Sequence, residues 1–384
     1  MILELLYILI IDLLALFGVY LIINISLNLE YGLTGLPNFG KVLAVAGGAF
    51  VAGSLPGRLM AEYFGLYRGI NAYAENSILV ECMRGLALQK PKILESAEFI
   101  EDNVLIVTCL NRLLANDPVL SVMILLLTVL VAAGVGAGLG FVSSYPAIRL
   151  REDYLAMTLL AMGEFMWTIG YYTRDLVGGT LGVSVVDPYG WAGVRERFLM
   201  ATLVLVGTAF LAFVYMGMVA RSPLGRLLRA VRDQELAAEA LGKDTVKIKR
   251  NVLMVSAALA AVAGALWAFY SGGIIAVGYD RVTWTFWPWV MVIVGGSGNT
   301  LGVLLGTGLF VSARKFIDYY KFALEPYLPF SVVWLDRLLL GVVLLAILLI
   351  RPGGAIPEKP TLTLARDKII RILNKLENSK EDLR

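Results

Sequence analysis

The residues of this sequence that are best suited to chemistry lie in one charged stretch between long apolar segments. Residues 221–250, RSPLGRLLRAVRDQELAAEALGKDTVKIKR, carry eight Lys and Arg residues and four acids. The 384-residue chain contains no histidine, so it lacks the commonest general base and the commonest transition-metal ligand. No G-x-x-x-x-G-K-[ST] phosphate-binding motif occurs. We therefore expect no catalytic residue, no metal site and no cofactor, and interpret the charged stretch as a binding surface.

Local signals predict that this stretch is helical. Ser222 suits the N-cap position and Pro223 the first helical position, while Gly242 is placed to end the helix. Asp244 then suits the cap of a following helix. Apolar residues recur at helical spacing: Leu224, Leu227, Leu228, Val231, Ala238 and Leu241. The result would be an amphipathic helix over 222–242 that either rests on anionic lipid or docks against a partner protein.

The rest of the chain has the composition of a membrane protein. Hydrophobic residues make up 58% of it and charged residues only 16%, against about 45–50% and about 25% in soluble domains. The mean hydropathy is +0.76. This composition predicts an all-α, polytopic helical membrane protein.

Apolar runs long enough to cross a bilayer give about nine predicted spans, including short or broken helices. The uninterrupted spans are 5–29, 39–56, 119–142, 154–173, 198–220, 252–272 and 331–350. The run 282–313 is interrupted at Gly295, Gly296, Ser297 and Gly298, so we expect two short helices, about 284–296 and 299–313. The N-terminal run has neither a basic region before it nor a clear cleavage site, so we expect it to be retained as the first span.

Charges in the loops predict the orientation. The stretch 221–250 has four more basic than acidic residues, and the tail 351–384 has eight basic residues against five acids. Both should therefore face the cytoplasm. Segment 57–118 has six basic and eight acidic residues, which suits the outside. Its apolar spacing predicts amphipathic helices on the outer surface. With nine spans, the N-terminus lies outside and the C-terminus inside. The tail should form a short helix over about 362–376.

Polar residues within the spans are the candidates for a solute pathway. Glu164 should face the protein interior because a carboxylate in lipid is costly, as part of a pathway or as a structural hydrogen-bond acceptor. Asn24 and Asn28 should pack against other helices. Two glycine-rich breaks, GLTGLPNFG and GGSGNTLG, either expose backbone polar groups beside a cavity or allow close helix packing. The pathway candidates are Asn28, Thr34, Asn38, Glu164, Ser297 and Asn299.

Three further features have structural interpretations. Cys82 and Cys109 are too few and too far apart for a metal motif, and we favour two buried free thiols over a disulfide. The aromatic cluster at 283–289 is typical of a membrane-interface belt. Asp12, near the start of the first span, is expected at the membrane interface.

Several stretches together resemble one family. The charged stretch is followed by VSAALAAVAGALWAFYSGG and VMVIVGGSGNTLGVLLGTGLF, and preceded by NLEYGLTGLPNFGKVLAVAGGAFVAG (28–53) and YPAIRLREDYLAMTLLAMGEFMW (145–167). In this order they resemble the branched-chain amino acid permease family, the membrane subunits of ATP-binding-cassette importers. Lys41 departs from the resemblance, standing where many relatives carry histidine, and 57–118 is a longer insertion than expected.

The resemblance implies a non-catalytic permease domain over 1–350, with an extracytoplasmic insertion at 57–118, a cytoplasmic coupling loop at 221–250 and a cytoplasmic tail. Its implied partners are two cytoplasmic ATPase subunits, a second permease subunit, an extracytoplasmic substrate-binding protein and the lipid bilayer, with no nucleic acid. The coupling residues would be Arg226, Arg229, Arg232, Glu235, Glu239 and Gly242.

Other functions stay open. A permease for urea, short amides or another polar solute would share this architecture. An ion-coupled carrier would usually need several intramembrane acids or bases, whereas Glu164 is nearly alone. A membrane enzyme would need clustered catalytic groups, and the lack of histidine counts against it.

Overall fold

The structure, a computed structural model, is almost entirely helical and confirms the all-α class. It describes residues 2–68, 77–87, 98–150, 152–193, 195–325, 334–351 and 353–358. The helices are α1 (Ile2–Leu27), α2 (Lys41–Tyr63), α3 (Ser77–Ala87), α4 (Asn103–Asn116), α5 (Pro118–Arg149), α6 (Glu152–Tyr172), α7 (Arg174–Val177), α8 (Arg197–Arg221), α9 (Pro223–Asp233), α10 (Glu235–Ala240), α11 (Thr245–Ser271), α12 (Trp287–Gly295), α13 (Thr300–Leu324) and α14 (Leu335–Ile350). Two-residue strands β1 (Val183–Ser184) and β2 (Gly273–Ile274) pair antiparallel. The predicted tail helix at 362–376 lies outside the described residues.

Six of the described helices are long and apolar enough to cross a membrane. They are α1, α2, α5, α8, α11 and α13. Three predicted spans correspond to α6, α12 and α14, of which α12 has only nine residues. The predicted break in 282–313 is confirmed, since α12 ends at Gly295 and α13 begins at Thr300. The chain is therefore a multi-pass membrane protein, while the count of nine spans stays a prediction.

Helix α11 lies at the centre of the bundle and packs against α5, α2 and α1. The approach is close because small residues meet backbone. A Cβ at Gly48 of α2 would overlap the carbonyl of Ala261, and one at Gly264 of α11 would overlap that of Val45. Small residues are the usual means of close packing between membrane helices, where lipid is as apolar as the side chains. Gly48 within α2 and Gly264 within α11 are therefore explained by the close contact between these two helices.

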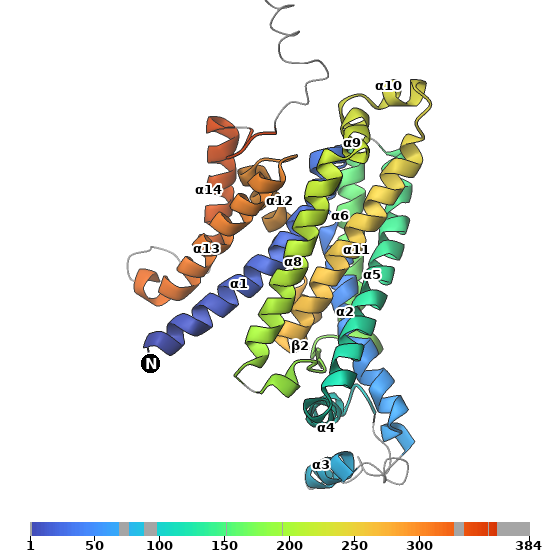
Figure 1. Ribbon diagram of the computed structural model, residues 1–384, viewed down its shortest axis with the longest axis vertical. Coiled ribbons are helices and arrows are strands. Elements are labelled where there is room, and N and C mark those ends of the chain that lie inside the picture. Colours follow the sequence, from blue (N-terminus) through green and yellow to red (C-terminus); the bar gives the residue numbers. More distant parts are fainter. Residues whose placement is uncertain are drawn as a thin grey trace, which may run out of the picture.

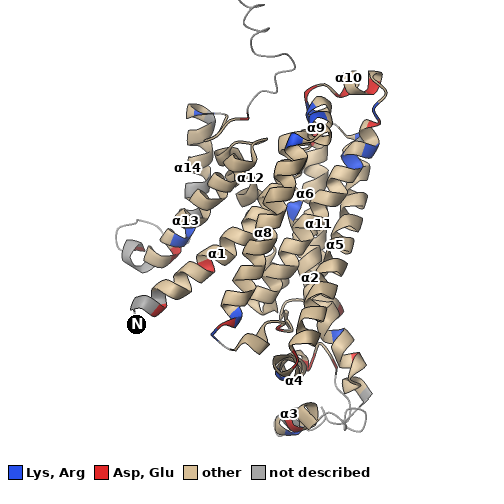
Figure 2. Cartoon of the chain, viewed as in Figure 1, with Lys and Arg blue, Asp and Glu red and all other residues tan. Residues whose placement is uncertain are grey.

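Most charged residues lie at the two ends of the bundle (Figure 2). Helices α9 and α10 occupy one end, and α3 and α4 occupy the opposite end, where α1 also begins (Figure 1). The two loops that were assigned to opposite sides of the membrane therefore lie at opposite ends of the molecule. Which end faces the cytoplasm stays a prediction.

Segment 57–118 differs from the expectation in two ways. Its helices α3 and α4 do not rely on lipid for their apolar faces. Instead they bury them together with the end of α2 in a separate core that includes Met60, Leu79, Met83, Ile106 and Leu110. The prediction of free thiols is wrong, because this pairing brings Cys82 and Cys109 into a disulfide with a Cα–Cα distance of 5.7 Å.

The aromatic cluster at 283–289 does not form an interfacial belt. Trp284, Trp287 and Trp289 are 3%, 3% and 6% exposed. The indole N–H of Trp289 donates to the carbonyl of Asn38 at 3.0 Å, and its ring stacks on Phe39. The expectation failed because tryptophans around the start of a short helix have the same pattern whether the helix begins among lipid headgroups or within protein.

Candidate functional site

The first element of the candidate site is the break between α1 and α2. Helix α1 continues into a π-helical turn, Asn28–Leu33, and the chain is then irregular until α2 begins at Lys41. Thr34 is buried and its hydroxyl donates to the carbonyl of Leu29 at 3.0 Å. Irregular backbone at membrane depth is tolerated only within protein or beside a cavity, because its polar groups need partners.

The second break, between α12 and α13, meets the first. The backbone N–H of Gly298 donates to Oδ1 of Asn28 at 2.8 Å. Asn299 caps α13 by accepting from the backbone N–H of Leu301 at 3.1 Å. Asn24, one turn before Asn28, donates to the hydroxyl of Thr307 at 2.7 Å. The expectation that these residues pack against other helices is confirmed for Asn24, which contacts α13, whereas Asn28 contacts the break between α12 and α13.

A buried ion pair crosses the first break. Nζ of Lys41 lies 3.0 Å from Oε2 of Glu30, and the two side chains are 1% and 0% exposed. Nζ also donates to Ser256 of α11 at 2.5 Å, and Asn38 donates to Oε1 of Glu30 at 3.2 Å. Neither Glu30 nor Lys41 was among the predicted site residues. The available signal was two opposite charges flanking a glycine-rich break in an otherwise apolar region.

A polar cavity of about 1030 Å³ opens beside these breaks. Its walls come from the first break, the second break, the α5–α6 connection and the α9–α10 end of the bundle. The structure brings together four residues that were predicted for two separate roles. Thr34 and Ser297 were pathway candidates, Arg232 and Glu235 were coupling candidates, and all four line this cavity. The lining also includes further charges of both signs: Arg149, Asp153, Asp233 and Lys249.

The local signals in 221–250 are confirmed, but the single helix is not. Ser222 caps α9 by accepting from the N–H of Gly225 at 3.3 Å, and Asp244 caps α11 through the N–H of Lys247 at 3.0 Å. Hydrogen bonding to that N–H, and then to the Lys247 side chain, lowers the pKa of the Asp244 carboxyl. Gly242 has a φ of +76° that suits glycine. The predicted helix 222–242 is divided at Gln234, whose extended backbone separates α9 from α10.

Most of the coupling candidates bind residues of this same chain. Arg229 and Arg232 each contact Glu358, Glu235 pairs with Lys249 at 2.6 Å, and Glu239 accepts from Thr245 at 2.5 Å. Arg226 is exposed. Leu236 of α10 and the following Leu241 are 76% and 81% exposed. Both lie at the end of the molecule that α10 occupies (Figure 1), outside the apolar bundle. These two leucines and Arg226 are therefore available to a partner.

Glu164 does not face the interior of this chain. Its side chain is 41% exposed and pairs with Arg281 at 3.0 Å. Asp12, expected at the membrane interface, pairs with Lys315 of α13 at 2.5 Å. Both carboxylates are thus paired with a cation on a segment that is distant in sequence. Residue spacing along one helix cannot predict such a pairing.

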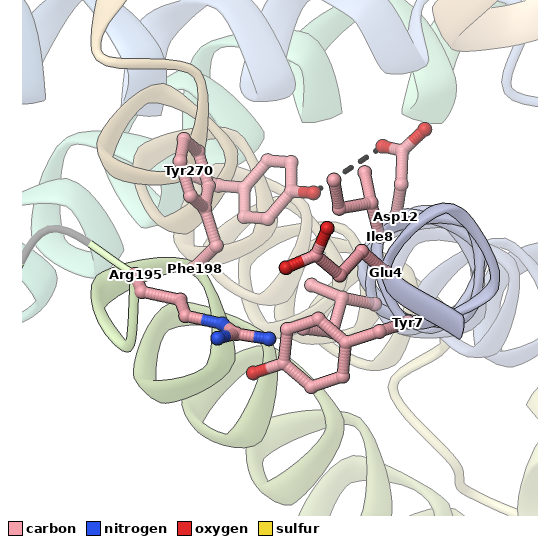
Figure 3. A pocket seen from close by; sticks show the side chains of 8 residues that line it. Glu4, Tyr7, Ile8, Asp12, Arg195, Phe198 and Tyr270 are labelled. Carbon is pink, nitrogen blue, oxygen red and sulfur yellow. Dashed lines mark hydrogen bonds between the residues drawn. The ribbon is translucent and has the colours of Figure 1, made fainter. Parts of the chain in front are cut away.

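A second pocket, of about 530 Å³, lies near the start of α1 (Figure 3), at the opposite end of the bundle from α9 (Figure 1). Its walls are mostly apolar or aromatic and include Ile8 and Phe198. The hydroxyl of Tyr270 donates to Asp12 at 3.3 Å (Figure 3), and Arg195 stacks over the Tyr7 ring. This second pocket shares no lining residue with the polar cavity.

Comparison with known proteins assigns this architecture to a family. The model of the permease component of branched-chain amino acid transport systems matches residues 9–348, which include both breaks and the α9–α10 loop. The chain belongs to this family. No solved structure matches it.

Curated relatives carry the same description. A probable branched-chain amino acid transport permease protein LivM of Methanocaldococcus jannaschii is 34% identical over 90% of this chain and 93% of its own length. The high-affinity branched-chain amino acid transport system permease proteins LivM of Salmonella typhimurium and Escherichia coli are 27% and 26% identical. Those alignments cover 60% and 61% of this chain and 57% and 58% of the bacterial proteins.

Proposed function

We propose that this chain is a transmembrane subunit of an ATP-binding-cassette importer for branched-chain amino acids. Two cytoplasmic ATPases, a second permease subunit and an extracytoplasmic substrate-binding protein would complete it. The observation that carries the proposal is the polar cavity in which both helix breaks meet α9 and α10. The family and the curated relatives support the substrate class.

In this proposal α9 and α10 lie in the cytoplasm and receive the movement of the ATPases. The exposed Leu236 and Leu241 would enter apolar depressions of the ATPase surface, and the exposed Arg226 of α9 would provide a charged contact. Helix α9 would pass the movement to the first break, where Arg232 donates to the carbonyl of Gly32. The disulfide-linked pair α3–α4 would then lie outside, near the binding protein.

The polar cavity suits the final stage of amino acid import. A free amino acid has an ammonium and a carboxylate, and the cavity offers acids and bases of both signs as well as backbone polar groups at the breaks. Such groups can replace part of the hydration of a zwitterion without binding it so tightly that release becomes slow. Thr34 and Ser297 are the uncharged polar candidates along this path.

The test is ATP-driven uptake by the complete transporter in vesicles. The complex would be purified with its ATPases, second permease and binding protein, and supplied with radiolabelled leucine, isoleucine, valine or urea. Uptake of the branched-chain amino acids that requires ATP and the binding protein is expected. Uptake of urea alone would favour the polar-solute permease, and uptake that needs an ion gradient without ATP would favour the ion-coupled carrier.

A further inference from the structure

The segment Gly353–Glu358, just after α14, lies against the second helix break. The N–H of Ala355 donates to the carbonyl of Val294 at 2.8 Å, and the N–H of Ile356 donates to that of Gly295 at 3.0 Å. Asn299 donates from its side chain to the carbonyl of Pro357 at 3.3 Å. The segment therefore satisfies backbone carbonyls that the end of α12 leaves without helical partners.

The same segment ends in a carboxylate that holds two arginines of α9. Oε1 of Glu358 lies 2.8 Å from Nε of Arg229, and Oε2 lies 2.8 Å from Nη1 of Arg232. The three side chains are 23%, 14% and 26% exposed, so water screens the contacts less than it would screen a surface pair. The Arg232 contact is a charge-assisted hydrogen bond, which is roughly twice as strong as a neutral one. The Arg229 contact is an ion pair.

Arg232 also reaches the first break, since it donates to the carbonyl of Gly32. Helix α9 is thus joined to both breaks, to the first directly and to the second through Glu358 and the segment 353–358. A Cβ at Gly298 would overlap the Glu358 carboxylate, so the break also touches Glu358 itself. Through this unbroken series of contacts, a displacement of α9 can move the second break.

We infer that Gly353–Glu358 is a strap that transmits the movement of α9 to the second helix break, with Glu358 as its positioning residue. This inference rests on the proposed function, because it assumes that ATPases move α9. It assigns a transport role to a segment that the sequence indicated only as the beginning of a tail. Glu358 positions the break and needs no contact with the substrate.

The decisive variant is Glu358→Gln in the complete transporter. The amide keeps the size of the side chain but removes the charge that holds both arginines. We expect ATP hydrolysis to continue while amino acid uptake per ATP falls about tenfold, a typical size for coupling between sites. Glu101→Gln is the matched control. It makes the same change in an exposed ion pair, where the carboxylate lies 3.6 Å from Nη2 of Arg174, and Glu101 lines neither the polar cavity nor the strap. Its uptake per ATP should fall far less.

A second variant tests the strap without changing charge. Ile356→Pro removes the N–H that donates to Gly295 and should lower uptake per ATP in the same direction as Glu358→Gln. Spin labels at Leu224 and Ser297 would report the movement directly. In the wild type, nucleotide trapping should displace both labels, and in Glu358→Gln only the label at Leu224.

The outcomes separate the two proposals. A wild-type complex without ATP-driven uptake overturns the proposed function and the strap with it. Normal wild-type uptake, together with an unchanged uptake-to-ATP ratio in both variants, overturns the strap alone. A parallel loss of uptake, hydrolysis and thermal stability would also overturn it, because Glu358 would then only stabilise the fold.

Discussion

Nζ of Lys41 and the carboxylate of Glu30 form an ion pair from which solvent is excluded, and the pair joins the two sides of the first helix break. Lys41 is the first residue of α2, where the positive end of the helix dipole disfavours a cation. Glu30 offsets this unfavourable position, and Ser256 ties the pair to the central helix α11. The pair therefore holds the irregular segment in place against the bundle.

Removing one member of this pair should be more damaging than removing both. Lys41→Met leaves a buried carboxylate without its cation, which should lower the free energy of unfolding by about 3–5 kcal/mol. The double variant Glu30→Gln, Lys41→Met should be less destabilised than Lys41→Met alone. Thermal unfolding of the purified complex in detergent measures the difference. If the losses of stability in the single variants Glu30→Gln and Lys41→Met add up to the loss in the double variant, the two charges act independently.

The exposed leucines of the α9–α10 loop should bind the ATPase. Leu236→Glu combined with Leu241→Glu places two charges in an apolar contact, and should weaken ATPase binding by about 2 kcal/mol, or roughly 30-fold. Copurification of the ATPase with the tagged permease is the measurement. Val104→Glu is the control, since Val104 of α4 is 64% exposed at the opposite end of the molecule. Equal binding by all three proteins would contradict the docking role. Arg229 is unsuitable for this test because it binds Glu358.

The two ends of the bundle should label from opposite sides of the membrane. Ala74, an obvious labelling position in 57–118, lies outside the described residues, so Asn116 at the end of α4 is the better choice. The disulfide makes Cys82 and Cys109 unreactive toward maleimide, so the native background can be kept. Asn116→Cys should react with an impermeant maleimide in intact cells, and Leu241→Cys only after the membrane is opened. The reverse pattern would invert the topology.

The disulfide should stabilise the α3–α4 pair locally. Its sequence separation is 27 residues, and loss of a bridge of this kind typically costs about 2–4 kcal/mol. In Cys82→Ser with Cys109→Ser, we expect faster proteolysis within α3 and α4 while the spans stay assembled. Limited proteolysis of detergent-purified protein would show it. If α3 and α4 were cleaved at the same rate in the variant as in the wild type, or in the wild type with and without a reductant, the prediction would be contradicted.

Much of the local structure could be predicted from the sequence because its causes lie within a few residues. The caps at Ser222 and Asp244, the helix stop at Gly242 and the break at 295–298 each depend on neighbours along the chain. Composition determined the class for the same reason, since a long apolar run needs no distant partner to indicate a membrane helix.

Which polar groups meet was decided only by the tertiary structure. In the sequence, Glu30 was not singled out, Lys41 was only a departure from the family's histidine, Glu358 was part of a cytoplasmic tail, and the two cysteines were separate thiols. Each depends on a partner that helix packing brings close. Glu358 is 126 residues from Arg232, and Gly298 is 270 residues from Asn28. Periodicity along the chain shows which face of a helix is apolar. The energy of an ion pair or a hydrogen bond, however, depends on the distance between its two atoms. That distance is set by the close approach of α2, α11 and the two breaks.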